Sequence, residues 1–128
     1  MKKTNKRRDK LADWIFCRLM DILNDQNREI VVVFKRLARG GLEKDGKTYN
    51  GQIGQKDIVD DGTQLITIDP QISKRSKMRV FCHELLHILF EDIDDEKPIE
   101  NLEHLLWPQL SESQKQMLGD YMYSLVKK

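Results

Sequence analysis

The H-E-x-x-H motif at positions 83–87 constrains the fold more than any other feature, because it lies inside the otherwise apolar run 80–90. At about 3.6 residues per turn, His83 and His87 fall on one face of a helix, roughly 40° apart. A helix that is apolar on nearly every side is buried in a core, where polar groups without partners are costly. We therefore expect a core helix whose two histidines and Glu84 share one partner.

A single zinc ion satisfies all three of these side chains. His83 and His87 can each direct one ring nitrogen at the same ion, as the i, i+4 spacing of a zinc-binding helix requires. Glu84 lies about 100° round the helix from His83, where it can reach a water on the ion without being a ligand. The motif thus predicts His83 and His87 as metal ligands, Glu84 as the catalytic residue and one Zn²⁺ as the cofactor.

A third ligand is expected on the next helix, because a catalytic zinc normally takes three protein ligands and keeps a position for water. This helix is predicted to begin at Pro98, with Ile99 on its buried stripe. At about 100° per residue, Glu103 lies only about 40° from Ile99, whereas Glu100 lies about 100° away. His104 lies about 140° away, as is typical of a surface histidine. The helical phase favours Glu103 as the third ligand and leaves Glu100 as the alternative.

The remaining patterns predict an α+β fold. They indicate an N-terminal helix, a small, twisted, three-stranded and mainly antiparallel sheet, the buried motif helix, and two C-terminal helices. The elements run in this order: a helix at about 9–24, a strand at about 29–36, a short irregular strand within 47–54, a strand at 64–69, the motif helix from Ser73 or Ser76 to about 90, a helix from 98 to 106–109, and a helix opened by the capping box 111–114.

Both terminal helices are predicted to be amphipathic, with apolar residues recurring every three to four positions. Each should bury one face against the core. The predicted buried residues are Leu11, Trp14, Ile15, Leu19, Ile22 and Leu23 in the first helix, and Met117, Leu118, Tyr121, Met122 and Leu125 in the last.

The composition suits one domain: 128 residues, 34% charged, 39% apolar, with a net charge of +1. This balance gives no general attraction to nucleic acid, and no segment reaches the about 18 apolar residues of a membrane span. Cys17 and Cys82 lie in apolar helical patterns, which is typical of reduced, buried thiols. Because the basic N-terminal segment is not followed by an apolar signal region, we expect a cytoplasmic protein with a flexible basic arm, residues 1–8, and one domain, residues 9–128.

The motif, followed by a glutamate on the next helix, resembles the gluzincin metallopeptidases, and more narrowly the compact ImmA/IrrE-type enzymes of phages and mobile elements. The order of elements is similar over about residues 9–126. The resemblance implies a zincin-like fold, a zinc ion held by His83, His87 and Glu103, and an edge strand beside the active site, here Leu65–Ile68. The chain departs from the family at 102–105, where Leu-Glu-His-Leu stands in place of a Glu-Ala pair with small residues.

Zinc-dependent hydrolysis of a peptide bond, as an endopeptidase acting on a specific protein, is the function that we expect. Glu84 would act as general base, and an extended peptide would add as a strand to the edge of Gln64–Ile68. Tyr49, Tyr121 and Tyr123 are the candidates for stabilising the oxyanion. The alternative is a metal-binding module that cleaves nothing, such as a regulatory, toxin–antitoxin or phage interaction protein. Nucleic-acid binding is disfavoured, and the sequence specifies no oligomeric state.

Overall fold

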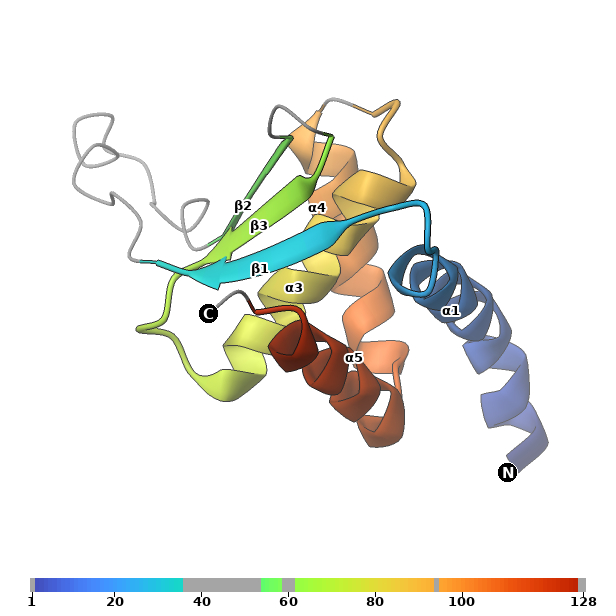
Figure 1. Ribbon diagram of the computed structural model, residues 1–128. Coiled ribbons are helices and arrows are strands. Elements are labelled where there is room, and N and C mark those ends of the chain that lie inside the picture. The colour runs from blue at the N-terminus through green and yellow to red at the C-terminus, as the bar shows by residue number, and fades with distance from the viewer. Residues whose placement is uncertain (1, 36–53, 59–61, 94, 127–128) are drawn as a thin grey trace.

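The structure, a computed structural model, describes residues 2–35, 54–58, 62–93 and 95–126 (Figure 1). The prediction of an α+β protein is confirmed. Of the short strand predicted within 47–54, residues 47–53, Tyr49 among them, lie outside the described residues, and Gly54 is the first residue of β2. In chain order the elements are α1 (Lys2–Leu23), β1 (Ile30–Phe34), β2 (Gly54–Ile58), β3 (Gln64–Ile68), α3 (Lys74–Leu89), α4 (Glu96–Leu106), the 3₁₀ helix η2 (Trp107–Gln109) and α5 (Glu112–Ser124).

The described strands form one mixed sheet in the order β1-β3-β2. β1 pairs parallel to β3, with Val32 opposite Ile66, and β2 pairs antiparallel to β3. The prediction of a mainly antiparallel sheet is therefore wrong. The prediction that Gln64–Ile68 is an edge strand is also wrong, because β3 is hydrogen-bonded on both sides. Its burial fits this central place: Ile66 and Ile68 are fully buried, as the strands of parallel pairs often are.

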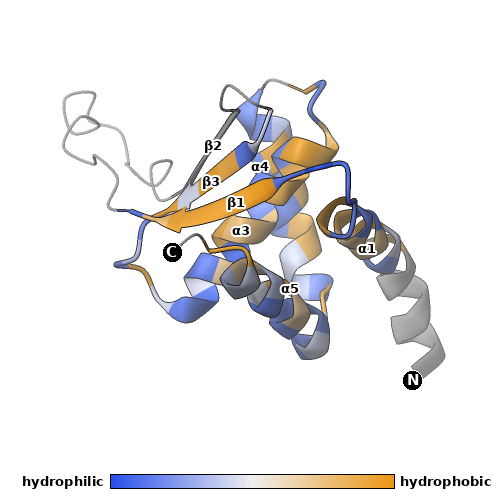
Figure 2. Cartoon of the chain, in the orientation of Figure 1, coloured by the Kyte–Doolittle hydropathy of each residue, from blue (hydrophilic) through white to orange (hydrophobic). Residues whose placement is uncertain are grey.

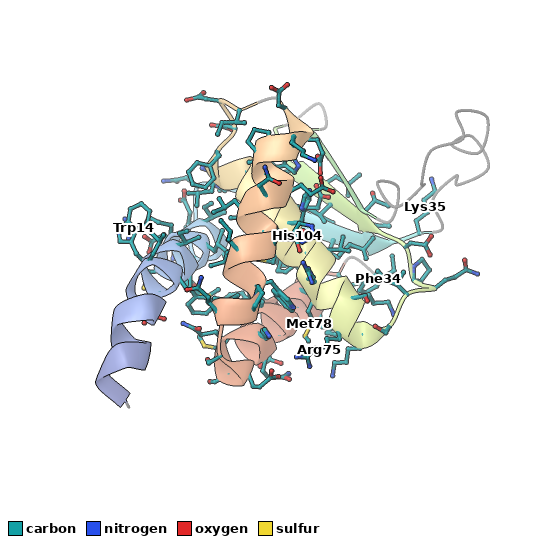
Figure 3. The ribbon with its side chains drawn as sticks, turned by 180° about the vertical axis from the view of Figure 1, so that it is seen from behind. Trp14, Phe34, Lys35, Arg75, Met78 and His104 are labelled. Atoms are coloured by element: carbon teal, nitrogen blue, oxygen red, sulfur yellow. The ribbon has the colours of Figure 1, made fainter. Side chains whose placement is uncertain are left out.

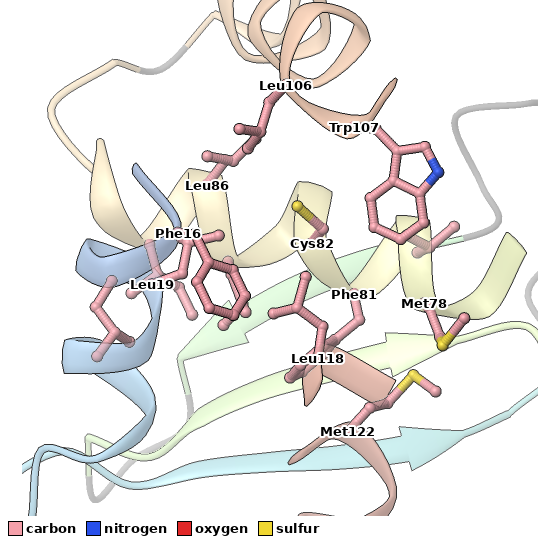
Figure 4. Close-up of a cluster of buried hydrophobic side chains, with 14 of the residues drawn as sticks. Phe16, Leu19, Met78, Phe81, Cys82, Leu86, Leu106, Trp107, Leu118 and Met122 are labelled. Carbon is pink, nitrogen blue, oxygen red and sulfur yellow. The ribbon is translucent and has the colours of Figure 1, made fainter. Parts of the chain in front are cut away.

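Helix α3 runs through the centre of the molecule, between the sheet and the other helices (Figure 1). Apolar residues gather on β1, β3 and α3 (Figure 2). Phe81, Leu85 and Leu86 of α3 are fully buried, and they belong to a cluster with residues of α1, α4 and α5 (Figure 4). The prediction that the motif lies on a buried core helix is confirmed.

Helix α1 includes residues 2–8, where the sequence predicted a flexible arm. Its buried stripe is Ala12, Ile15, Phe16, Leu19 and Ile22, at the spacing of one helix face. Leu11 and Trp14 are 65% and 56% exposed, and Trp14 lies at the surface in Figure 3. The predicted burial of Leu11 and Trp14 is wrong because the buried face also includes Ala12 and Phe16. These two residues lie on the side of that face away from Leu11 and Trp14. None of the described helices is long and apolar enough to cross a membrane.

Helix α5 begins with the predicted capping box, in which the Ser111 and Gln114 side chains each bond the other residue's backbone N–H. Leu118 and Met122 are fully buried, whereas the predicted burial of Met117 is wrong, since it is 42% exposed. A Cβ on Gly119 would lie 2.5 Å from the Sδ atom of Met78. The missing side chain therefore lets α5 approach α3 closely at this point.

Candidate metal centre

Helix α3 brings the two motif histidines together, one turn apart on one face. Its start is fixed by Ser73, whose hydroxyl accepts a hydrogen bond from the backbone N–H of Ser76. The imidazole rings of His83 and His87 meet edge to face, with centroids 4.9 Å apart. Their Nε2 atoms are 3.2 Å apart. Two ligands about 2.05 Å from one tetrahedral zinc would be about 3.3 Å apart, so the pair fits a shared ion.

The carboxylate that joins these two nitrogens belongs to Glu96, the first residue of α4. One Glu96 oxygen lies 2.6 Å from Nε2 of His83, and the other lies 2.9 Å from Nε2 of His87. One donor atom from each of the three residues lies within 4.8 Å of the others. Two imidazole nitrogens and a carboxylate are a donor set that zinc accepts. The residues therefore fit a zinc ion.

Glu103 faces inward, as the helical phase predicted, and is 7% exposed. It contacts the other ring nitrogen of His83: its Oε1 atom lies 3.2 Å from Nδ1. Its Oε2 atom accepts a hydrogen bond from Nε of Arg79. The structure thus brings Glu103 to the centre, but on the far side of the His83 ring from Glu96. The prediction that Glu103 is the third ligand stays a prediction. Glu100, the alternative, is exposed.

The sequence reasoning missed Glu96 because it placed the helix start at Pro98. The structure begins α4 two residues earlier, and Pro98 lies in the first turn, where a missing N–H breaks no helical hydrogen bond. Glu96 and Glu103 are seven residues apart, about two turns, so they lie on the same face. Extending the helix by two residues would have identified Glu96 from the same phase argument.

Ionisable side chains form a hydrogen-bonded series along the seam between α3 and α4. In spatial order they are His87, Glu96, His83, Glu103, Arg79 and His104. Burial lowers the pKa of His83, but the hydrogen bond that His83 donates to Glu103 and the nearby charges of Glu84, Glu96 and Glu103 outweigh it and raise that pKa to about 9. Burial works to raise the pKa of Glu103, but His83 and Arg79 lower it below its usual range. A metal ion must therefore displace a proton from His83.

Glu84 is buried beside the centre, with 6% of its surface exposed, and its negative charge acts on His83. Cys82, the residue before His83, is fully buried, and Figure 4 places its thiol in the apolar cluster. Burial, with a smaller effect of Glu103, raises the pKa of this thiol to about 12. The prediction of a buried thiol is confirmed for Cys82 and wrong for Cys17, which is exposed.

The two described candidates for the oxyanion partner make contacts elsewhere. The hydroxyl of Tyr121 donates a hydrogen bond to Oδ1 of Asn24, at 2.7 Å. Tyr123 packs on Phe34, and Lys74 at the start of α3 lies over its ring. Since His83 is nine residues further along α3, about 13 Å at 1.5 Å per residue, Tyr123 lies towards the opposite end of that helix. The contacts of these tyrosines do not link them to the histidines.

No family model, no curated protein and no solved structure matches this chain. The resemblance to gluzincins therefore stays an expectation from the motif and the order of elements.

Proposed function

We propose that this chain is a zinc-dependent metallopeptidase that hydrolyses peptide bonds in a protein substrate. The observation that carries the proposal is the convergence of Nε2 of His83, Nε2 of His87 and the carboxylate of Glu96 on one point. Glu84, a buried carboxylate, follows His83 directly in the same helix. This combination of ligands and an adjacent base is the working part of an H-E-x-x-H hydrolase.

The arrangement favours a catalytic centre over a structural one. Within the described ranges three donors converge, whereas structural zinc sites use four protein ligands. The side chain of Glu96 is 60% exposed, while those of His83 and His87 are 13% and 17% exposed. The centre is thus anchored in the core on the α3 side and reaches solvent on the Glu96 side. A substrate could approach from there without any rearrangement of the core.

Glu84 carries the proton transfer in this proposal. When bound, zinc supplies Lewis acidity, which acidifies a water and polarises the scissile carbonyl. Glu84 would then accept a proton from the attacking water and deliver it to the leaving amine. Glu103 accepts a hydrogen bond from Nδ1 of His83, so that Nε2 keeps a free lone pair for the ion.

An extended substrate would pair with β2, because β3 has no free edge. β3 is bonded to β1 and β2, so the strand addition expected at Gln64–Ile68 has no room there. β2 (Gly54–Ile58) pairs on one side only among the residues that the structure describes. Within that described part of the chain, its outer edge has backbone groups without a strand partner, which can hold an extended chain by main-chain hydrogen bonds.

The test compares zinc content and cleavage in wild type, Glu84→Gln and the matched variant Glu100→Gln, whose glutamate is exposed on α4. Cleavage is read by mass spectrometry on a proteome-derived peptide library, and zinc by elemental analysis. We expect wild type and Glu100→Gln to bind zinc and cleave, and Glu84→Gln to bind zinc and lose about 10²–10⁴-fold in rate. Equal rates in wild type and Glu84→Gln would refute the mechanism. Stoichiometric zinc without cleavage in wild type would instead indicate the alternative, a metal-binding module.

A further inference from the structure

Arg79 lies one helical turn before His83, on the face of α3 that meets α4. Its Nε donates to Oε2 of Glu103, and its Nη2 lies 3.2 Å from Nδ1 of His104. The other oxygen of Glu103 faces Nδ1 of His83. The carboxylate thus bridges Arg79 and His83 with one oxygen each. Figure 3 shows His104 on α4, beside α3.

A histidine that binds a metal through Nε2 carries its proton on Nδ1, and that N–H needs a fixed acceptor. Glu103 is this acceptor for His83. A buried carboxylate is stable only when it is paired and hydrogen-bonded. Arg79 supplies both the charge and a donor of defined direction, because its guanidinium is planar. The orientation of the His83 ring therefore depends on a residue that does not touch the three converging donors.

We infer that Arg79 is a positioning residue of the metal centre: it holds Glu103 so that Glu103 orients His83 for metal binding. This inference rests on the proposed zinc centre. It differs from the alternative in which Glu103 is itself a ligand. In that alternative Arg79 competes with the metal for the carboxylate, and its removal strengthens binding or leaves it unchanged. Under our inference its removal weakens binding, so the two have opposite signs.

The experiment measures zinc affinity of the full chain by competition with a chromogenic chelator, in wild type, Arg79→Met, Arg79→Lys and Arg75→Met. Arg75 is the matched control, since it lies one turn earlier on α3 and pairs with Glu112 on the surface. We expect Arg79→Met to weaken zinc binding by about 10–100-fold. Arg79→Lys should bind more tightly than Arg79→Met because it restores the charge, and Arg75→Met should match wild type.

A second readout follows His83 directly. In the zinc-bound protein, ¹⁵N spectra of the imidazole report whether Nδ1 carries a hydrogen-bonded proton. We expect this signal to shift in Arg79→Met and to return towards its wild-type position in Arg79→Lys. A purely structural role of Arg79 would lower stability without moving this resonance relative to Arg75→Met.

A double variant keeps the test decisive if Arg79→Met folds poorly. Arg79→Met with Glu103→Gln leaves no unpaired buried charge. If Arg79 acts on His83 only through Glu103, the double variant binds zinc as tightly as Glu103→Gln alone. Additive losses would overturn the inference, and so would an Arg79→Met protein that binds zinc as tightly as wild type. A wild type that binds no zinc would overturn the proposed centre itself, and this role with it.

Discussion

On the side of α3 that meets α5, Met78 packs against Gly119 and Leu118 is fully buried. On the side that meets α4, His83 and Arg79 face two glutamates. The first face contributes stability through burial of apolar surface. The second places charges in a partly buried seam, where pairing offsets desolvation at best. A seam of this kind adds little to stability, so the comparison points to function as the reason for the α4 face.

The largest expected effect tests the apolar face. Phe81 is fully buried, so Phe81→Ala should cost about 3–5 kcal/mol of unfolding free energy, because it removes apolar contacts and leaves a cavity. Leu105→Ala is the control: Leu105 is 65% exposed on α4, and its truncation should stay within about 0.5 kcal/mol. Urea denaturation of the metal-free proteins measures both. Similar losses in the two variants would contradict the assignment of the core.

The next effect tests which carboxylate completes the centre. Glu96→Gln should weaken zinc binding by more than about 100-fold, since it removes a ligand rather than a partner of one. Glu103→Gln should lose less, and Glu100→Gln should match wild type because its side chain is exposed. Chelator competition ranks the three variants. If Glu103→Gln proves worst while Glu96→Gln matches wild type, Glu103 is the third ligand, as the sequence predicted.

Glu96 and Glu103 also show how much of the site could be predicted from the sequence. The apolar run and the i, i+4 histidines were enough to place α3 in the core, and phase was enough to turn Glu103 inward. Phase could not identify the atom that Glu103 meets, because that depends on where α4 begins relative to α3. The predicted helix start at Pro98 left Glu96 outside the helix, whereas the structure begins α4 two residues earlier and brings Glu96 to the histidines.

The sheet was harder to predict for a related reason. Runs of β-branched and aromatic residues, bounded by polar or turn residues, located β1 and β3 to within two residues, but pairing depends on contacts between segments far apart in the chain. β1 and β3 are separated by about thirty residues, and their parallel pairing leaves no local signal. The same holds for Leu11 and Trp14: the period was right, but a helix with apolar residues on two flanks does not reveal which flank is buried.

A smaller effect on stability is expected from zinc binding on the α4 face. Zinc at 100 times its Kd should stabilise the folded protein by about 2.7 kcal/mol, because only the folded state holds the three donors together. Adding a chelator should remove this gain, and His87→Ala should abolish it. Thermal unfolding across a zinc series measures the effect. An equal gain in His87→Ala would mean that zinc stabilises the protein from another position.

The smallest change concerns the two thiols, which differ in burial although both lie on helices. Cys17 is exposed and Cys82 is buried, so Cys17→Ser should alter the unfolding free energy by less than about 0.5 kcal/mol. Cys82→Ser should cost about 1–3 kcal/mol, because it places a hydroxyl in the apolar cluster. An aromatic disulfide reagent should therefore titrate one thiol in the native protein and two in denaturant. If both thiols react rapidly in the native protein, the apolar cluster around Cys82 must open readily. Such opening would disturb the adjacent residue His83, which the proposed metal centre requires in a fixed position.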